Sequence, residues 1–97
     1  MQAMSATVRL PPVLRQDAGG AREVEASGAT VRELLEDLVA RNPALGDRVY
    51  DGTEIRSYVN VYVDGEDVRT RGGLDAPVRD GATVVLLPAM AGGDATR

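Results

Sequence analysis

The chain has 97 residues and a formal net charge of −4, and it contains neither cysteine nor histidine. This length fits one domain, and the acidic balance disfavours nucleic acid as a partner, because such binding depends on neutralising phosphates. The lack of cysteine excludes disulfides, thiol nucleophiles and thiolate metal sites. The lack of histidine removes the usual general base and the commonest metal ligand. We therefore expect a protein that is not an enzyme and that binds no metal or other cofactor itself.

The N-terminus does not show the charged segment followed by an apolar one that marks a secretion signal. No apolar run approaches the ~20 residues that a membrane-spanning helix needs. We therefore expect a cytoplasmic protein that has no membrane partner.

The first elements are two strands. Apolar and polar side chains alternate over Ser5–Leu10, which predicts a strand with one buried face. Pro11 and Pro12 end the regular pairing of this strand with a neighbour, and the residue types of Asp17–Gly20 favour a turn. A second alternating stretch over Ala21–Ala26 predicts a strand that pairs with the first in a long hairpin.

The clearest predicted helix starts after Thr30. Thr30 is a good N-cap residue, and Glu33 completes a capping box. Apolar residues then recur at helical spacing and form one stripe: Val31, Leu34, Leu35, Leu38 and Val39. Asn42-Pro43 ends the helix. We expect Ala44–Arg56 to be irregular, with apolar anchors at Leu45, Val49 and Ile55.

The C-terminal half predicts three more strands. Tyr58–Val63 alternates, Asp64-Gly65 is a tight hairpin signal, and Glu66–Arg69 begins a short return strand. The last strand, Thr83–Leu87, is apolar on both faces, which predicts a central strand covered on both sides. The fold class is therefore α+β, with a mixed four- to five-stranded sheet and one main helix on one face.

Three Gly-Gly pairs occur, at Gly19-Gly20, Gly72-Gly73 and Gly92-Gly93. The first two lie between predicted strands, where a turn explains them. The third follows Pro88 and a run of small residues close to the chain end, so it has no further element to turn into. The simplest interpretation is that this segment is a frayed chain end without a function.

The alternative is a tail that enters the active site of a partner. Glycine lets a backbone approach another surface closely, and the five residues after Pro88 that end at Gly93 reach at most about 18 Å. Adenylation by ATP would activate a terminal carboxylate, and sulfide could then replace the adenylate. The product, a thiocarboxylate, would let a chain without cysteine carry sulfur.

The chain resembles the ubiquitin-like sulfur-carrier family, which includes the small subunit of molybdopterin synthase and the thiamin-pathway sulfur carrier. The resemblance spans Val8 to Gly93, and the ending Leu87–Gly93 looks like the signature of that family. The segment Val59–Arg69, followed by Gly72-Gly73-Leu74, is most similar to the actinobacterial carrier associated with cysteine synthase.

The resemblance implies a β-grasp domain over residues 1–88 and a flexible tail over 89–97. It implies a thiocarboxylate on Gly93, with Ala91, Gly92 and Gly93 threading into a partner. The implied partners are an E1-like adenylating and sulfur-transferring protein that uses ATP, a sulfur-accepting synthase that uses pyridoxal phosphate, and a zinc-dependent JAMM-type protease. The cofactors belong to these partners, and the carrier alone is expected to be a monomer.

The chain departs from the family pattern after Gly93. Family members usually end at the second glycine, whereas Asp94, Ala95, Thr96 and Arg97 follow here. These four residues would carry the terminal carboxylate up to about 13 Å past Gly93. We therefore predict that the JAMM-type protease removes them before activation. A degenerate terminus that blocks activity is the competing explanation.

We expect the partner to dock on the sheet face opposite the helix, through Tyr58, Tyr62 and Val85. That face should also carry one set of alternate residues of the last strand. From the other strands it should carry the polar residues Thr7, Arg9, Glu23, Glu25 and Asn60. The final sulfur acceptor stays open, with cysteine synthesis or a sulfur-containing metabolite preferred. Two alternatives also stay open: a protein modifier ligated through Gly93, and a β-grasp interaction module with an inert tail.

Overall fold

The structure is a computed structural model that describes residues 5–89, while residues 1–4 and 90–97 lie outside the described part. Its five strands are β1 (Ser5–Arg9), β2 (Glu23–Ser27), β3 (Val59–Val63), β4 (Glu66–Asp67) and β5 (Thr83–Pro88). The helices are α1 (Pro12–Arg15), α2 (Val31–Arg41) and α3 (Pro43–Val49). Three short 3-10 turns complete the described chain: η1 (Gln16–Ala18), η2 (Val68–Thr70) and η3 (Gly73–Asp75).

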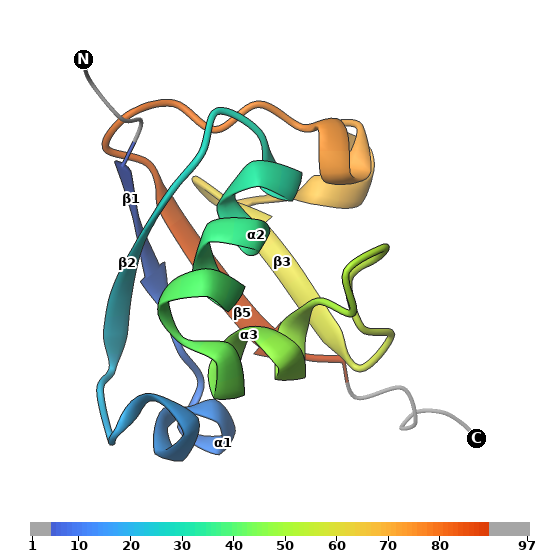
Figure 1. Cartoon of the computed structure of the whole chain (residues 1–97). Coiled ribbons are helices and arrows are strands. Elements are labelled where there is room, and N and C mark those ends of the chain that lie inside the picture. The colour runs from blue at the N-terminus through green and yellow to red at the C-terminus, as the bar shows by residue number, and fades with distance from the viewer. Residues whose placement is uncertain (1–4, 90–97) are drawn as a thin grey trace.

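The five strands form one mixed sheet in the order β2-β1-β5-β3-β4 (Figure 1). The two central strands, β1 and β5, run parallel, and every other neighbouring pair is antiparallel. The N-terminal hairpin pairs Ala6 with Ala26 and Val8 with Val24, as the alternation predicts. The α+β class with a mixed sheet is therefore confirmed.

Helix α2 begins where its capping residues predict. The Thr30 hydroxyl accepts a hydrogen bond from the Glu33 backbone N–H at 3.2 Å. The Glu33 carboxylate accepts from the N–H of Ala29 at 2.9 Å, one residue before the N-cap position that a capping box uses. The Thr30 contact satisfies a backbone N–H group that the first turn of a helix leaves without a partner, and the Glu33 contact fixes the residue that precedes the N-cap.

The prediction of an irregular segment after α2 is wrong, because Pro43–Val49 forms α3. Pro43 ends α2 but also starts α3, since proline is favoured at the first position of a helix. The predicted anchors Leu45 and Val49 are buried on this helix. Gly46 lets α3 approach α2 closely: a Cβ added there would lie 2.5 Å from the Cα of Val39.

The stretch after β3 also differs from the prediction. Asp64 and Gly65 turn the chain with positive φ angles of 49° and 88°, as expected of a tight hairpin. The return strand β4 then covers only Glu66–Asp67, because Val68 leaves the ladder and becomes buried in η2. As a result, β4 pairs only with Tyr62 and Val63, and the outer edge of β3 from Val59 to Val61 has no strand partner in the described chain.

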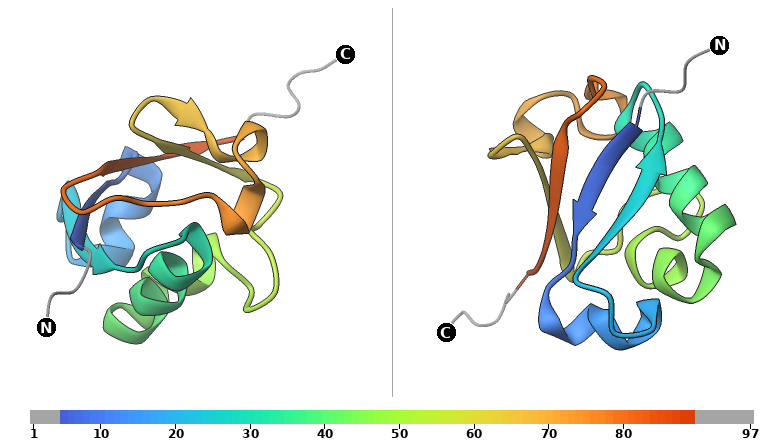
Figure 2. Two further views of the ribbon diagram at one scale, coloured as in Figure 1. Left: turned by 90° about the horizontal axis from the view of Figure 1, so that it is seen from above. Right: turned by 90° about the vertical axis from the view of Figure 1, so that its left-hand side faces the viewer.

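The core lies between the sheet and the two longer helices. Figure 2 shows α2 and α3 on the same side of the sheet, with the opposite side uncovered. Within residues 5–89 the buried residues of this core are aliphatic apart from Tyr50, and no charged residue is buried. No helix of the described chain is long and apolar enough to cross a membrane.

The strand β5 is central, as predicted, but it is not covered on both sides. Val84 and Leu86 point into the core and are fully buried, whereas Val85 is partly exposed and Leu87 is 43% exposed. An apolar run on both faces therefore does not mark a strand buried on both faces here. The sheet has one open face, and two apolar side chains of its central strand lie on it.

Candidate functional site

The residues predicted to carry the chemistry, Ala91–Gly93, and the predicted removable extension, Asp94–Arg97, lie outside the described residues. What the structure defines is the base from which this segment starts. Strand β5 ends at Pro88, at the end of the molecule that also holds α1 and α3 (Figure 1). The N–H of Ala89 donates a 2.8 Å hydrogen bond to the carbonyl of Tyr58, which ties the last described residue to the start of β3.

The predicted docking residues fall into two places. Tyr62 and Val85 are directly opposed in the β3–β5 ladder, and such pairs share one face of a sheet. Tyr58 lies four residues before Tyr62, just beyond the end of this ladder and hydrogen-bonded to Ala89, and half of its surface is exposed. The structure thus joins Tyr62 with Val85 and puts Tyr58 at the base of the tail.

One row of side chains crosses the whole open face. The ladder registers place the following residues side by side from β2 to β4: Glu23, Arg9, Val85, Tyr62 and Asp67. The centre of this row is apolar and aromatic, and each end is charged. Leu87 extends the apolar centre toward the tail, because it follows Val85 on the same face and pairs with Asn60.

Two ion pairs flank this row. Arg9 lies 3.8 Å from Glu23, and Arg69 lies 2.6 Å from Asp67. The Arg69 guanidinium and its backbone N–H both bond to Asp67, and these bonds hold the pKa of that carboxyl below its ordinary value. The open face therefore presents an apolar centre between two charged pairs, in which Asp67 is the most covered side chain, an arrangement suited to contact with another protein.

Exposed apolar side chains gather at the base of the tail. Among the described residues, the exposed large apolar side chains are Val13 (53%), Tyr58 (51%) and Leu87 (43%). Of these three, Tyr58 was predicted from the sequence to contact a partner, whereas Val13 and Leu87 were not. The exposure of Val13 could have been predicted from its neighbour Leu14. Adjacent residues of a helix point in different directions, and Leu14 is the one that is buried.

A hollow of about 200 Å³ is lined by Val13 and Tyr58, but not by Leu87. Its walls come from α1 (Val13, Leu14), from the start of β3 (Tyr58) and from the last described residues (Pro88, Ala89). Arg48, on α3, is the one charged residue in its lining. The hollow therefore adjoins the base of the tail and is mostly apolar.

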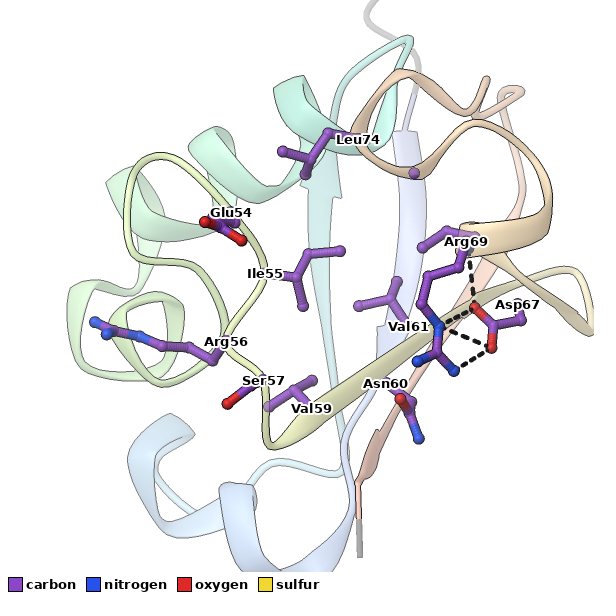
Figure 3. A pocket seen from close by; sticks show the side chains of 12 residues that line it. Glu54, Ile55, Arg56, Ser57, Val59, Asn60, Val61, Asp67, Arg69 and Leu74 are labelled. Carbon is purple, nitrogen blue, oxygen red and sulfur yellow. Dashed lines mark hydrogen bonds and ion pairs between the residues drawn. The ribbon is translucent and has the colours of Figure 1, made fainter. Parts of the chain in front are cut away.

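A second hollow, of about 270 Å³, lies along the outer edge of β3 where β4 gives no cover (Figure 3). Ile55, Val61 and Leu74 line it, and the Asp67–Arg69 pair stands at its rim (Figure 3). It exists because β4 is so short. Its lining contains no histidine or cysteine, and nothing in the described chain connects it with the tail chemistry.

Residues 5–89 contain no cluster of three acidic, histidine or cysteine side chains that could hold a metal ion. The groups available at the candidate site are apolar side chains, two tyrosines and paired charges. Such groups can bind a protein surface.

Comparison with known proteins assigns the family. Residues 8–93 match the ThiS family. The sulfur carrier protein CysO of Mycobacterium tuberculosis is 41% identical over 93 residues, which is 93% of this chain and 100% of that protein. A chain in the crystal structure of the Amycolatopsis orientalis BexX/CysO complex superposes with a TM-score of 0.81 at 45% identity, covering 91% of this chain and 99% of that one.

A third likeness is to the small archaeal modifier protein 1 of Methanosarcina acetivorans, with a TM-score of 0.80 at 25% identity, covering 96% of this chain and 100% of that one. These structures share the mixed five-stranded sheet and its helices, so the predicted β-grasp fold is confirmed. The CysO relative is named as a sulfur carrier protein, and such small carriers are not catalysts. The chain belongs to the ThiS family of ubiquitin-like sulfur carriers.

Proposed function

We propose that this protein carries sulfur as a thiocarboxylate on Gly93. The observation that carries the proposal is the family match, whose segment ends on Gly93 and leaves Asp94–Arg97 outside it. The relatives named as sulfur carriers span nearly the whole chain. The base of the tail supports the proposal because apolar side chains surround the point where the segment starts.

The proposed chemistry has four steps. Water first cleaves the Gly93–Asp94 peptide bond in the active site of a zinc-dependent JAMM-type protease. The freed Gly93 carboxylate then attacks the α-phosphorus of ATP in an E1-like partner, releasing pyrophosphate. Hydrogen sulfide, as HS⁻, attacks the carbonyl carbon of the resulting acyl adenylate and displaces AMP, which leaves a thiocarboxylate on Gly93. The thiocarboxylate passes its sulfur to a synthase that makes cysteine or another sulfur-containing metabolite, with pyridoxal phosphate in that synthase.

The open face supports a docking role for Tyr62, Val85 and Leu87. The complex of a CysO protein with BexX in Amycolatopsis orientalis gives an example of such a carrier assembled with another protein. We infer that this chain uses its open face to bind the proteins that receive its tail. Removal of water from that apolar centre would favour binding, and the ion pairs at its edges would orient it.

Intact mass spectrometry tests the chemistry. The full chain and a chain ending at Gly93 are each incubated with the adenylating partner of the same organism, ATP and sulfide. We expect the shorter chain to gain the mass that replacement of one oxygen by sulfur adds, and the full chain to gain it only after the protease is added. Gly93→Ala should abolish the gain without unfolding the domain. If the shorter chain never gains sulfur, the proposal is wrong.

A second candidate is a protein modifier, which the likeness to a small archaeal modifier protein favours. In that case Gly93 would be joined to lysines of target proteins. To distinguish the two functions, cell extracts are digested and searched for peptides in which Gly93 is linked to a lysine side chain. A protein that acts only as a carrier leaves no such peptide. The third alternative, an interaction module with an inert tail, predicts that Gly93→Ala retains full function in cells.

A further inference from the structure

The hollow beside α1 is separate from the open face, and the carrier chemistry does not by itself explain it. Its apolar walls include Val13 and Tyr58, each about half exposed. Most large apolar side chains of the described chain are buried in the core. Two exposed ones on opposite walls of one hollow mark a place where apolar surface is left in water, which costs free energy unless another molecule covers it.

The position of the hollow ties it to the tail. Pro88 and Ala89 form part of its wall, and Gly93 follows Ala89 by four residues, which span at most about 14 Å. Any protein that holds the Gly93 carboxylate in its active site must therefore reach within about that distance of the hollow. A surface that grips the tail on this side meets Val13 and Tyr58 directly.

The charge of the hollow limits what fits. Arg48 is its one charged lining residue, and within residues 5–89 its guanidinium forms one ion pair, with Asp17. Its nearest carboxylate is that of Asp17, 3.5 Å away, and this contact is too loose to give the Asp17 oxygen a hydrogen-bond partner. Arg48 therefore keeps donors for a further carboxylate, and an incoming lysine or arginine is disfavoured.

Resting on the proposed function, we propose that this hollow receives one apolar side chain of the adenylating partner, next to a carboxylate of that partner that pairs with Arg48. A hollow of about 200 Å³ has room for one side chain of the size of leucine or methionine. The contact would fix the base of the tail while the glycines beyond it extend into the ATP site. It would thereby set the register that places Gly93, and not a neighbouring residue, at the reacting phosphate.

The test uses two matched substitutions of exposed apolar residues. Val13→Glu puts a charge on the wall of the hollow, and Ala40→Glu puts one on the exposed side of α2, away from both the hollow and the open face. Pyrophosphate release by the adenylating partner is measured as a function of carrier concentration, with the carrier form that the mass experiment shows to be activated. Urea denaturation checks that both variants keep the stability of the wild type.

We expect Val13→Glu to raise the KM for the carrier about tenfold or more, because a charge replaces a buried apolar contact. Ala40→Glu should leave that KM unchanged. Arg48→Gln should raise it less and should make it less sensitive to salt, whereas Arg48→Lys should restore the salt dependence.

Three results would overturn the inference. One is a Val13→Glu carrier with the KM of the wild type. Another is a Val13→Glu carrier with a changed kcat and an unchanged KM, since docking at the base is then not affected. The third is a lowered KM for Val13→Glu, which would mean that the tail of this chain itself occupies the hollow. The wild-type protein is active in all three, so these outcomes differ from failure of the proposed function, in which the wild type is not adenylated.

Discussion

The central strand β5 presents apolar residues on both faces of the sheet, yet the two faces have different roles. On one face, α2 and α3 cover Val84 and Leu86 completely. On the other, Val85 and Leu87 of the same strand stay partly in solvent, between two ion pairs. The covered face determines stability, and the open face with the adjoining tail base is left available for partners. Neighbouring residues of one strand can thus be divided between folding and binding.

Replacing Leu86 and Leu87 one at a time is the strongest way to test this division. Leu86→Ala should cost about 2–5 kcal/mol in free energy of unfolding, because the cavity lies in a packed core. Leu87→Ala should cost about 0.5 kcal/mol or less, while raising the KM for the adenylating partner. Urea denaturation and pyrophosphate release measure the two effects. Equal costs for the two changes would mean that the faces do not differ as the structure shows.

Gly46 tests how closely the covered face is packed. In an exposed helix, replacing glycine by alanine stabilises by about 1 kcal/mol. Here the added methyl group would lie 2.5 Å from the Val39 Cα, so Gly46→Ala should destabilise the protein by about 1–3 kcal/mol. Thermal and urea denaturation both report the change. A stabilised variant would show that α2 and α3 are not in close contact.

The smallest expected effect concerns a charge outside both faces. The Asp51 carboxylate accepts hydrogen bonds from the backbone N–H groups of Thr53 and Glu54, each at 2.7 Å. These bonds lower its pKa below the ordinary value of 3.8. A lowered pKa in the folded state stabilises the protein above that ordinary value, and the contribution is lost as the pH falls through the folded-state pKa.

Asp51→Asn keeps an oxygen that can accept these bonds but removes the charge. The variant should therefore be slightly less stable than the wild type at neutral pH. The difference should shrink as the pH falls below the ordinary pKa of 3.8 and disappear below the lowered folded-state pKa. Urea denaturation at a series of pH values measures it. A difference that does not change with pH would contradict the assigned role of the charge.

Local patterns sufficed for the elements whose signals are contained in a few neighbouring residues. Thr30 and Glu33 mark the start of α2, and the apolar stripe that follows marks its buried face. Asp64-Gly65 marks the hairpin turn. Helix α3 was missed because Pro43 was interpreted only as the end of one helix, although proline also starts helices. The start of the tail after Pro88 was predicted, and the fold explains why apolar residues surround it.

The sequence by itself determined the α+β class, the main helix, the central position of the last strand and the likeness to a carrier family. Only the tertiary structure decided that β5 is covered on one side, that Tyr58 is separated from Tyr62 and Val85, and that Val13 meets Tyr58 across a hollow. The reason is physical. The preference of a residue for a helix or a strand depends largely on its own side chain, but its burial depends on residues from distant parts of the chain that pack against it. Val13 and Pro88 are 75 residues apart in the chain and become neighbours only when β1 and β5 pair in parallel.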